Sequence, residues 1–130
     1  MATTEEREIL EHEYVHIYTN GQGNIVLYFG NENKKPLAVG QKMNEINEEA
    51  YMNGYNWDAF LNYYLTGNAP DILESMESDP EAGSYVAYFD DTAENEQKAK
   101  RFADIIIFLI ENEEEIYKIL REKGDEIEWD

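Results

Sequence analysis

The sequence of 130 residues has no cysteine, few basic residues and no long apolar run. The absence of cysteine excludes disulfides, thiol nucleophiles and thiolate metal sites. The longest apolar run, Ile105–Ile110, is far shorter than the roughly 20 residues of a membrane-spanning helix. The N-terminal segment, MATTEEREILEHE, has neither the basic nor the apolar region of a signal peptide. We therefore expect one cytoplasmic domain covering residues 1–130, with no membrane partner.

Basic residues are scarce relative to acidic ones. The 10 Lys and Arg face 29 Asp and Glu, which gives a formal net charge of −19. Residues 1–65 hold 10 acids and 4 bases, whereas residues 66–130 hold 19 acids and 6 bases. Such a field repels nucleic acids and anionic membranes and attracts basic partners. Solubility alone is the other explanation of this charge, and the composition leaves both open.

A β-hairpin is the clearest local prediction. Residues 13–19 (EYVHIYT) alternate and are rich in β-branched and aromatic side chains, which favours a strand. Residues 20–23 (NGQG) suit a turn, and residues 24–30 (NIVLYFG) form a second apolar run. Both sides of this second strand are apolar, so we expect it to be central and covered on both faces. Residues 84–89 (SYVAYF) predict a further strand of the same kind.

The other segments predict helices and minor elements. Residues 5–11 suggest a short helix or a frayed end, and residues 37–39 suggest a short third strand. The tail, DEIEWD, fits either an edge strand or an arm folded over the surface. The predicted helices run from Gln41 to Gly54, from an Asn56 cap to Gly67, over residues 70–77, and from a cap at Asp91 or Thr92 to Gly124 with a break at Asn112. The order predicts an α+β fold, a small mainly antiparallel sheet (hairpin 13–30 plus strand 84–89) with helices packed on it.

Five aromatic residues lie in the segment NGYNWDAFLNYYL, residues 53–65. Trp57, Phe60 and Tyr64 follow the spacing of a buried helical stripe, so we assign them to the core. Tyr63 falls on the opposite side of the helix with Asp58. Tyr55 precedes the predicted helix, and its spacing fits core or surface equally.

The sequence contains no recognisable catalytic motif. It has no nucleophile elbow, phosphate loop, dinucleotide-binding glycine pattern or zinc-ligand spacing, and it predicts no cofactor. His12 and His16 would stand about 13 Å apart in a strand, at roughly 3.3 Å per residue, which is too far for one metal ion. Paired acids such as Asp90 and Asp91 permit a carboxylate-based hydrolase. However, 29 acids in 130 residues produce such pairs by chance.

The sequence resembles a known bacterial family. The similarity lies in INEEAYMNGYNWDAFLNYYL, NAPDILESMESDPEAGSYVAYF and the final GDEIEWD. It covers most of residues 40–130 and is similar to the immunity protein 51 family of polymorphic toxin systems. Gly54, Tyr55 and Trp57 and the terminal Glu128–Trp129–Asp130 match its motifs. This resemblance implies a small cytosolic inhibitor that binds the toxic domain of a protein encoded beside it.

The residues and the resemblance lead to the same functional hypothesis. We expect an immunity protein, not an enzyme, that occludes a cognate toxin domain, and the acidic charge favours a basic toxin such as a nuclease. The alternative is an acidic mimic of nucleic acid that inhibits DNA- or RNA-binding proteins, with a carboxylate-based hydrolase third. The sequence leaves the oligomeric state open. Aromatic and acidic side chains suit a protein interface, and the predicted partner-binding residues are Tyr55, Asp58, Tyr63, Asp90, Asp91, Asp125, Glu126, Glu128, Trp129 and Asp130.

Overall fold

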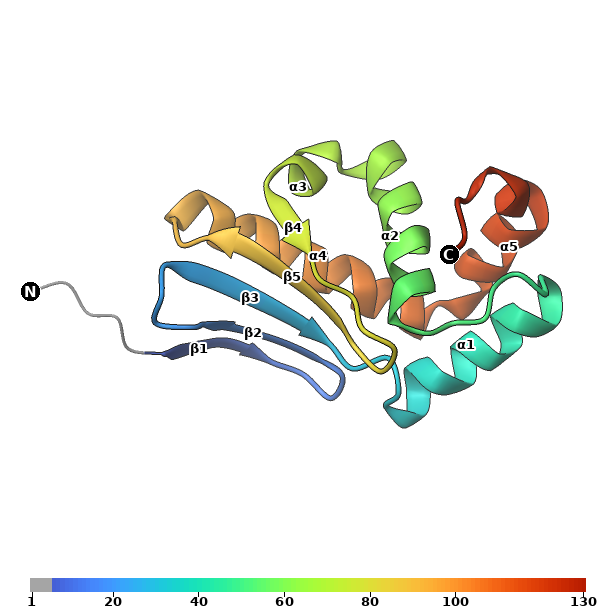
Figure 1. Ribbon diagram of the computed structural model, residues 1–130, viewed down its shortest axis with the longest axis horizontal. Helices are drawn as coiled ribbons and strands as arrows, with labels where there is room; N and C mark the ends of the chain where they lie inside the picture. The colour runs from blue at the N-terminus through green and yellow to red at the C-terminus, as the bar shows by residue number, and fades with distance from the viewer. Residues whose placement is uncertain (1–5) are drawn as a thin grey trace, which may run out of the picture.

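A five-stranded antiparallel sheet carries the fold in the computed structural model, which describes residues 6–130 (Figure 1). The strand order is β1-β2-β3-β5-β4. The strands are β1 (Arg7–Glu11), β2 (Val15–Thr19), β3 (Asn24–Phe29), β4 (Met76–Ser78) and β5 (Tyr85–Asp90). The helices are α1 (Lys34–Ile46), α2 (Gly54–Asn68), α3 (Pro70–Glu74), α4 (Ala93–Glu111), α5 (Glu113–Lys123) and the 3₁₀ turn η1 (Gly124–Glu126). The predicted α+β class is confirmed.

The predicted hairpin is formed by β2 and β3. Gly21 and Gly23 have φ values of 75° and 89°, which glycine adopts without steric cost. The Asn20 side chain accepts hydrogen bonds from the backbone N–H of Gln22 and Asn24, which fixes the turn. β5 then pairs with β3 on the side away from β2, so the predicted strand 84–89 also forms, shifted by one residue.

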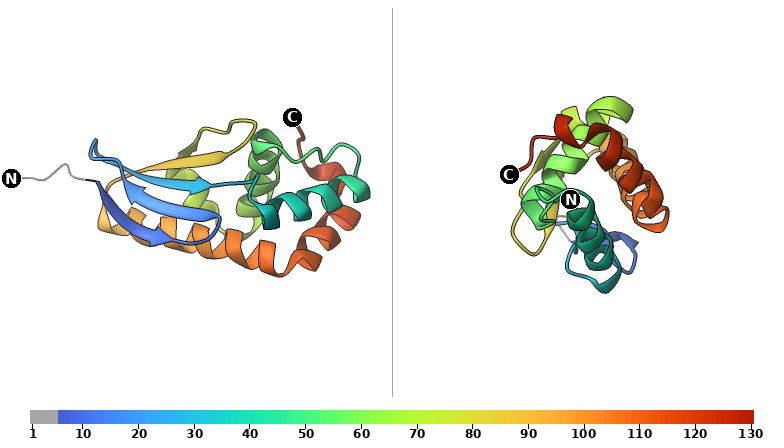
Figure 2. Two further views of the ribbon diagram at one scale, coloured as in Figure 1. Left: turned by 90° about the horizontal axis from the view of Figure 1, so that it is seen from below. Right: turned by 90° about the vertical axis from the view of Figure 1, so that its right-hand side faces the viewer.

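Only one face of the sheet is covered by helices among the described residues. α4 packs across β2, β3 and β5, and α2 contacts β5, as the views in Figure 2 show. Ile25, Leu27 and Phe29 of β3 point into this covered side and are fully buried. The prediction that this strand is covered on both faces is therefore wrong. Its other side carries half-buried Asn24 and Tyr28 and buried Val26, which is shielded by the rings of Tyr18 and Tyr88 on neighbouring strands and not by a helix.

Three short elements differ from their predicted form. Residues 7–11 pair with β2 as an edge strand, and neither a helix nor a frayed end forms there. Residues 37–39 lie inside α1, because Val39 and Met43 are buried four residues apart on one helix face. The predicted helix 70–77 ends at Glu74, and Met76–Ser78 pairs with β5 instead. For residues 7–11 and 76–78, pairing with another strand outweighs the local pattern.

The start of α2 also differs from its prediction. Asn53, and not Asn56, caps the helix, since its side chain accepts the backbone N–H of Asn56 at 3.0 Å. Gly54 begins this helix and does not end the preceding one. A Cβ atom on Gly54 would lie 1.8 Å from the Glu81 carbonyl oxygen, so only glycine fits against that loop. α2 continues one residue past Gly67, to Asn68.

Other helix boundaries confirm the sequence signals. Thr92 caps α4 by accepting the backbone N–H of Asn95 at 3.1 Å. Asn112 separates α4 from α5, although its side chain makes no cap hydrogen bond. Gly124 follows the last residue of α5 and begins η1.

The core surrounds Trp57, which is 1% exposed. Its ring meets those of Phe29 and Phe60 edge-on, with centroids 5.1 and 6.1 Å away. The assignment of Trp57 and Phe60 to the core is confirmed. Tyr64 packs against the core as predicted, but it is only half-buried and lies at the margin of the core. No helix in residues 6–130 is both long and apolar enough to cross a membrane.

Candidate partner-binding groove

Residues 124–130, here called the C-terminal arm, fold back against α2 (Figure 1). Ile127 is 5% exposed and belongs to the core. The Trp129 indole N–H donates to the Gly124 carbonyl at 3.2 Å. The backbone N–H of Asp130 donates to the side-chain oxygen of buried Asn56 at 2.7 Å. Of the two forms predicted for the tail, the folded arm is therefore the one observed.

A groove of about 420 Å³ runs between α2 and this arm, and we call it the arm groove. One wall is a single face of α2, because its residues recur at helical spacings of three and four. The other wall is the arm. The lining residues are Tyr55, Asp58, Ala59, Asn62, Tyr63, Thr66, Glu126, Glu128, Trp129 and Asp130. Seven of the ten residues predicted from the sequence thus lie in one groove.

The lining of the arm groove is acidic. Asp58, Glu126, Glu128 and Asp130 contribute carboxylates, and no Lys or Arg is among the lining residues of the described chain. The nearest compensation is Lys123, whose ammonium lies 3.7 Å from Glu126. Both partners of that pair are more than half exposed, so the ion pair is weakened by solvent. The groove therefore presents negative charge to an approaching molecule.

Tyr63 joins the two walls of the groove. Its hydroxyl donates to a Glu126 carboxylate oxygen at 2.9 Å. That hydrogen bond raises the pKa of Tyr63 above its usual value, since it is lost when the phenol ionises. Tyr55, at 42% exposure, is the more open ring of the groove, and Trp129 is half-buried. The rings of Tyr55, Tyr63 and Trp129 thus supply aromatic contact area in the groove.

Asp58 lies half-buried at the base of the groove wall. One of its carboxylate oxygens is shielded from solvent and has no hydrogen-bond partner among the described residues. Behind it, the Tyr85 hydroxyl is fully buried and equally unpaired. Burial raises the pKa of Tyr85, and the charge of Asp58 raises it further. Tyr85 therefore stays neutral, and Asp58 keeps one shielded carboxylate oxygen without a hydrogen bond from the described residues.

Three predicted residues lie outside the arm groove. Asp90 ends β5 and Asp91 precedes α4, beside the β2–β3 turn, where the Asp91 N–H donates to the Gly23 carbonyl. This end of the sheet lies at the left of Figure 1, whereas the C-terminus lies to the right. Asp125 lies on the exposed side of η1 and does not line the groove. The predicted residues therefore fall on at least two separate surfaces.

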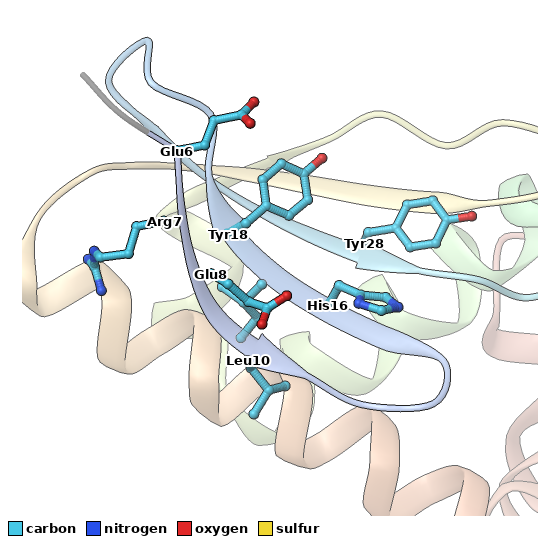
Figure 3. A pocket seen from close by; sticks show the side chains of 8 residues that line it. Glu6, Arg7, Glu8, Leu10, His16, Tyr18 and Tyr28 are labelled. Atoms are coloured by element: carbon cyan, nitrogen blue, oxygen red, sulfur yellow. The ribbon is translucent and has the colours of Figure 1, made fainter.

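Sequence reasoning missed a second surface, on the open face of the sheet. His16, Tyr18 and Tyr28 project from the same side of the sheet, as Figure 3 shows, and Tyr88 of β5 shares that face. The available signal was the alternation in VHIYT, where buried Val15, Ile17 and Thr19 alternate with half-buried His16 and Tyr18. Period-two alternation assigns these rings to the uncovered side.

The described residues form no group suited to a metal ion, and three carboxyls with lowered pKa values do not suit general-acid chemistry. No group of three or more His, Asp or Glu in residues 6–130 is placed to hold a metal ion. The pKa values of Asp71, Glu96 and Glu111 are lowered, chiefly by hydrogen bonds from Arg101, Arg7 and Lys35. A general acid needs a raised pKa, so these three carboxyls do not fit that role.

Fold and groove together define a small α+β protein with an acidic groove that is lined in part by aromatic rings. The chain matches the model of the immunity protein 51 family over residues 15–125, and it belongs to that family. No curated protein and no solved structure matches it. Membership of an immunity-protein family implies neutralisation of a toxin, and such proteins are generally inhibitors without enzymatic activity.

The matched range refines the resemblance drawn from the sequence. It includes the β2–β3 hairpin, which contributed little to that resemblance. It ends before Glu128–Trp129–Asp130, which contributed much. One wall of the arm groove, α2, thus lies within the family range, and most of the arm lies beyond it.

Proposed function

We propose that this protein binds and neutralises a cognate toxin domain by occlusion, using the arm groove as its contact surface. The observation that supports the proposal most is the convergence of Tyr55, Asp58, Tyr63 and the arm into one acidic groove, in a chain of an immunity-protein family. Binding without chemistry accounts for the absence of catalytic motifs in the sequence.

The chemistry of the groove favours a basic partner. Interface residues that contribute most to affinity are aromatic residues and arginine, surrounded by polar groups. Here Tyr55 and Trp129 supply rings, and Asp58 and Glu128 supply carboxylates that match Lys or Arg. A net charge of −19 accelerates encounter with a positively charged domain. A nuclease toxin fits this description, because a surface that binds phosphates is basic.

Nucleic-acid mimicry is the alternative, and the overall charge favours it. A mimic would bind unrelated basic proteins, and its affinity would fall steeply with salt. A groove with fixed rings predicts a different pattern, in which one partner is bound and binding persists at moderate salt. Binding to several unrelated nucleic-acid-binding proteins at low salt, lost at moderate salt, would therefore favour mimicry over a cognate toxin.

The test is co-expression with the toxin domain encoded beside this gene, together with a binding titration. The wild-type chain should rescue growth and bind the purified domain. Glu128→Lys, an exposed groove substitution, should weaken binding about tenfold or more. Glu48→Lys makes the same charge change at an exposed position outside the groove, and it should retain binding. Absence of both rescue and binding would refute the function, and equal binding by the two variants would refute the groove.

A further inference from the structure

The open face of the sheet carries an ordered row of side chains across all five strands. In the strand register, Glu8 faces Tyr18, Tyr18 faces Val26, Val26 faces Tyr88, and Tyr88 faces Glu77. The row thus has two tyrosines and a valine at its centre and a glutamate on each edge strand. We call it, with its neighbours, the open sheet face.

A second row runs beside the first. Glu11 faces His16, His16 faces Tyr28, and Tyr28 faces Val86. The rings of His16 and Tyr28 have centroids 6.1 Å apart. This row repeats the pattern, with an acid on the β1 edge and rings toward the centre, so the pattern covers an area and not a single line.

The centre of the open sheet face is packed without a covering helix. Val26 is only 2% exposed, although it lies outside the main core on the uncovered side. Its cross-strand neighbours, Tyr18 and Tyr88, flank it on both sides. Aromatic cross-strand pairs of this kind stabilise a sheet, and they also leave a broad, rigid surface of half-exposed rings.

A hollow of about 380 Å³ lies on this face beside Tyr18, Tyr28 and His16 (Figure 3). Arg7, the one Lys or Arg among the described residues that line it, is turned toward α4, where its guanidinium lies 2.9 Å from Glu96. Its charge is therefore matched on the other side of the sheet. The hollow faces solvent with rings and with the carboxylates of Glu6 and Glu8.

Tyr18, on this face, remains neutral. Burial raises the pKa of Tyr18, and the nearby Tyr88, Glu6 and Tyr28 raise it further. A neutral phenol keeps its hydroxyl donor and a ring face of negative potential. Arginine stacks on such a face, and adjacent carboxylates add hydrogen bonds to its guanidinium.

The charge of the face selects among possible occupants. A second copy of the chain would bring Glu8, Glu11 and Glu77 of each copy together without a compensating cation on the outward positions of the described strands. A nucleic acid would be repelled by the same groups. A protein segment that bears Arg and Lys matches both the rings and the acids at the edges.

We propose that the open sheet face is a second docking surface, which takes an arginine- and lysine-bearing segment of the toxin domain while the arm groove takes another part. The identity of this partner rests on the proposed function. The rings of Tyr18, Tyr28 and Tyr88 supply the contact, and Glu8 and Glu77 guide the segment from the two edges.

The test compares two double variants with the same change of charge. Glu8→Lys with Glu77→Lys alters the edges of the face, and Glu45→Lys with Glu48→Lys is the control at exposed positions elsewhere. Association with the toxin domain should slow about tenfold at low salt for the edge variant, and less than about threefold for the control. Matching thermal melts verify that both variants fold. Equal association rates for the two variants would overturn the proposal. Binding of the toxin domain by the unmodified protein would still support the proposed function in that case.

A second probe decides the case in which the toxin domain does not bind. A synthetic peptide of alternating Arg and Thr is titrated into the labelled protein, and backbone amide shifts are followed. Shifts concentrated at residues 16–18, 26–28 and 86–88, and reduced in the edge variant, would support the face as a site for basic segments. Shifts spread over the acidic surface, concentration-dependent self-association of the protein, or equal binding of an oligonucleotide would overturn it.

Discussion

Replacing Asn56 by alanine should release the C-terminal arm. The Asn56 side chain is 3% exposed, donates to the Tyr51 carbonyl at 2.8 Å and accepts the Asp130 N–H at 2.7 Å. A hydrogen bond of this kind contributes about 0.5–1.5 kcal/mol net, so the loss of both should cost about 2 kcal/mol. The Asp130 amide, which loses its acceptor, should exchange with solvent much faster.

The matched control is Asn62→Ala on the same helix. Asn62 is half-exposed, and its side chain makes no hydrogen bond among the described residues; only its backbone carbonyl accepts one, from the Thr66 hydroxyl. Its replacement should change the free energy of unfolding by less than about 0.5 kcal/mol. Urea denaturation measures both variants, and hydrogen exchange reports the Asp130 amide. If Asn56→Ala costs no more than the control and the Asp130 amide stays protected, the arm is not held by Asn56.

Four further predictions concern separate parts of the molecule. Trp57→Ala should destabilise the fold by about 3–5 kcal/mol, because it empties the centre of the core, and a normal melting temperature would contradict this. Gly54→Ala should lower the melting temperature, since its Cβ would clash with the Glu81 carbonyl, whereas Gly67→Ala should not, because no atom lies within 4 Å of its Cβ. Tyr63→Ala should barely change the melting temperature, because its hydrogen bond is exposed, but should weaken toxin binding. Asp71 has a lowered pKa, so the stability from its pair with Arg101 is present above the ordinary pKa of about 3.8 and is lost as the pH falls through the lowered value. Asp71→Asn should therefore lose less stability in acid than the wild type. Identical curves of unfolding free energy against pH for the two proteins would contradict this prediction.

Local periodicity predicted the parts of the fold that depend on it. The stripe through Trp57 and Phe60 was readable because a buried helix face repeats every 3.6 residues. The hairpin was readable because two strands flank Gly21 and Gly23, and turn chemistry is local. The boundary at Thr92 follows the same rule, since capping depends on neighbouring residues, and the break at Asn112 forms without a side-chain cap.

Long-range contacts explain what the sequence did not reveal. Arg7–Glu11 has no strong strand pattern of its own, and it is extended because β2 offers an edge and Glu96 offers an ion pair. The two apolar sides of β3 suggested burial between layers, but Tyr18 and Tyr88 cover Val26 from neighbouring strands. The pattern within one strand does not indicate which side chains of the neighbouring strands will lie beside it.

The candidate site shows the same division. Composition and resemblance selected residues from α2 and from the arm, but not their meeting in one groove. That meeting depends on contacts between Asn56 and Asp130, and between Tyr63 and Glu126, which are 74 and 63 residues apart in sequence. Asp90 and Asp91 were selected because they are acidic, as the arm residues were, but they lie at the other end of the sheet. The charge of a residue does not indicate where the folded chain places it.

The role of Asn56 links stability to binding. The sequence pattern predicts Asn56 as the cap of α2, whereas in the structure its buried side chain holds the arm by accepting the Asp130 N–H. An arm already docked through Asn56, Trp129 and Ile127 does not have to be ordered when a partner arrives, and this lowers the entropic cost of association. If the arm groove binds the toxin, Asn56→Ala should therefore weaken binding even though Asn56 does not line the groove. Its effect should appear mainly in the dissociation rate, since long-range charge steering is unchanged.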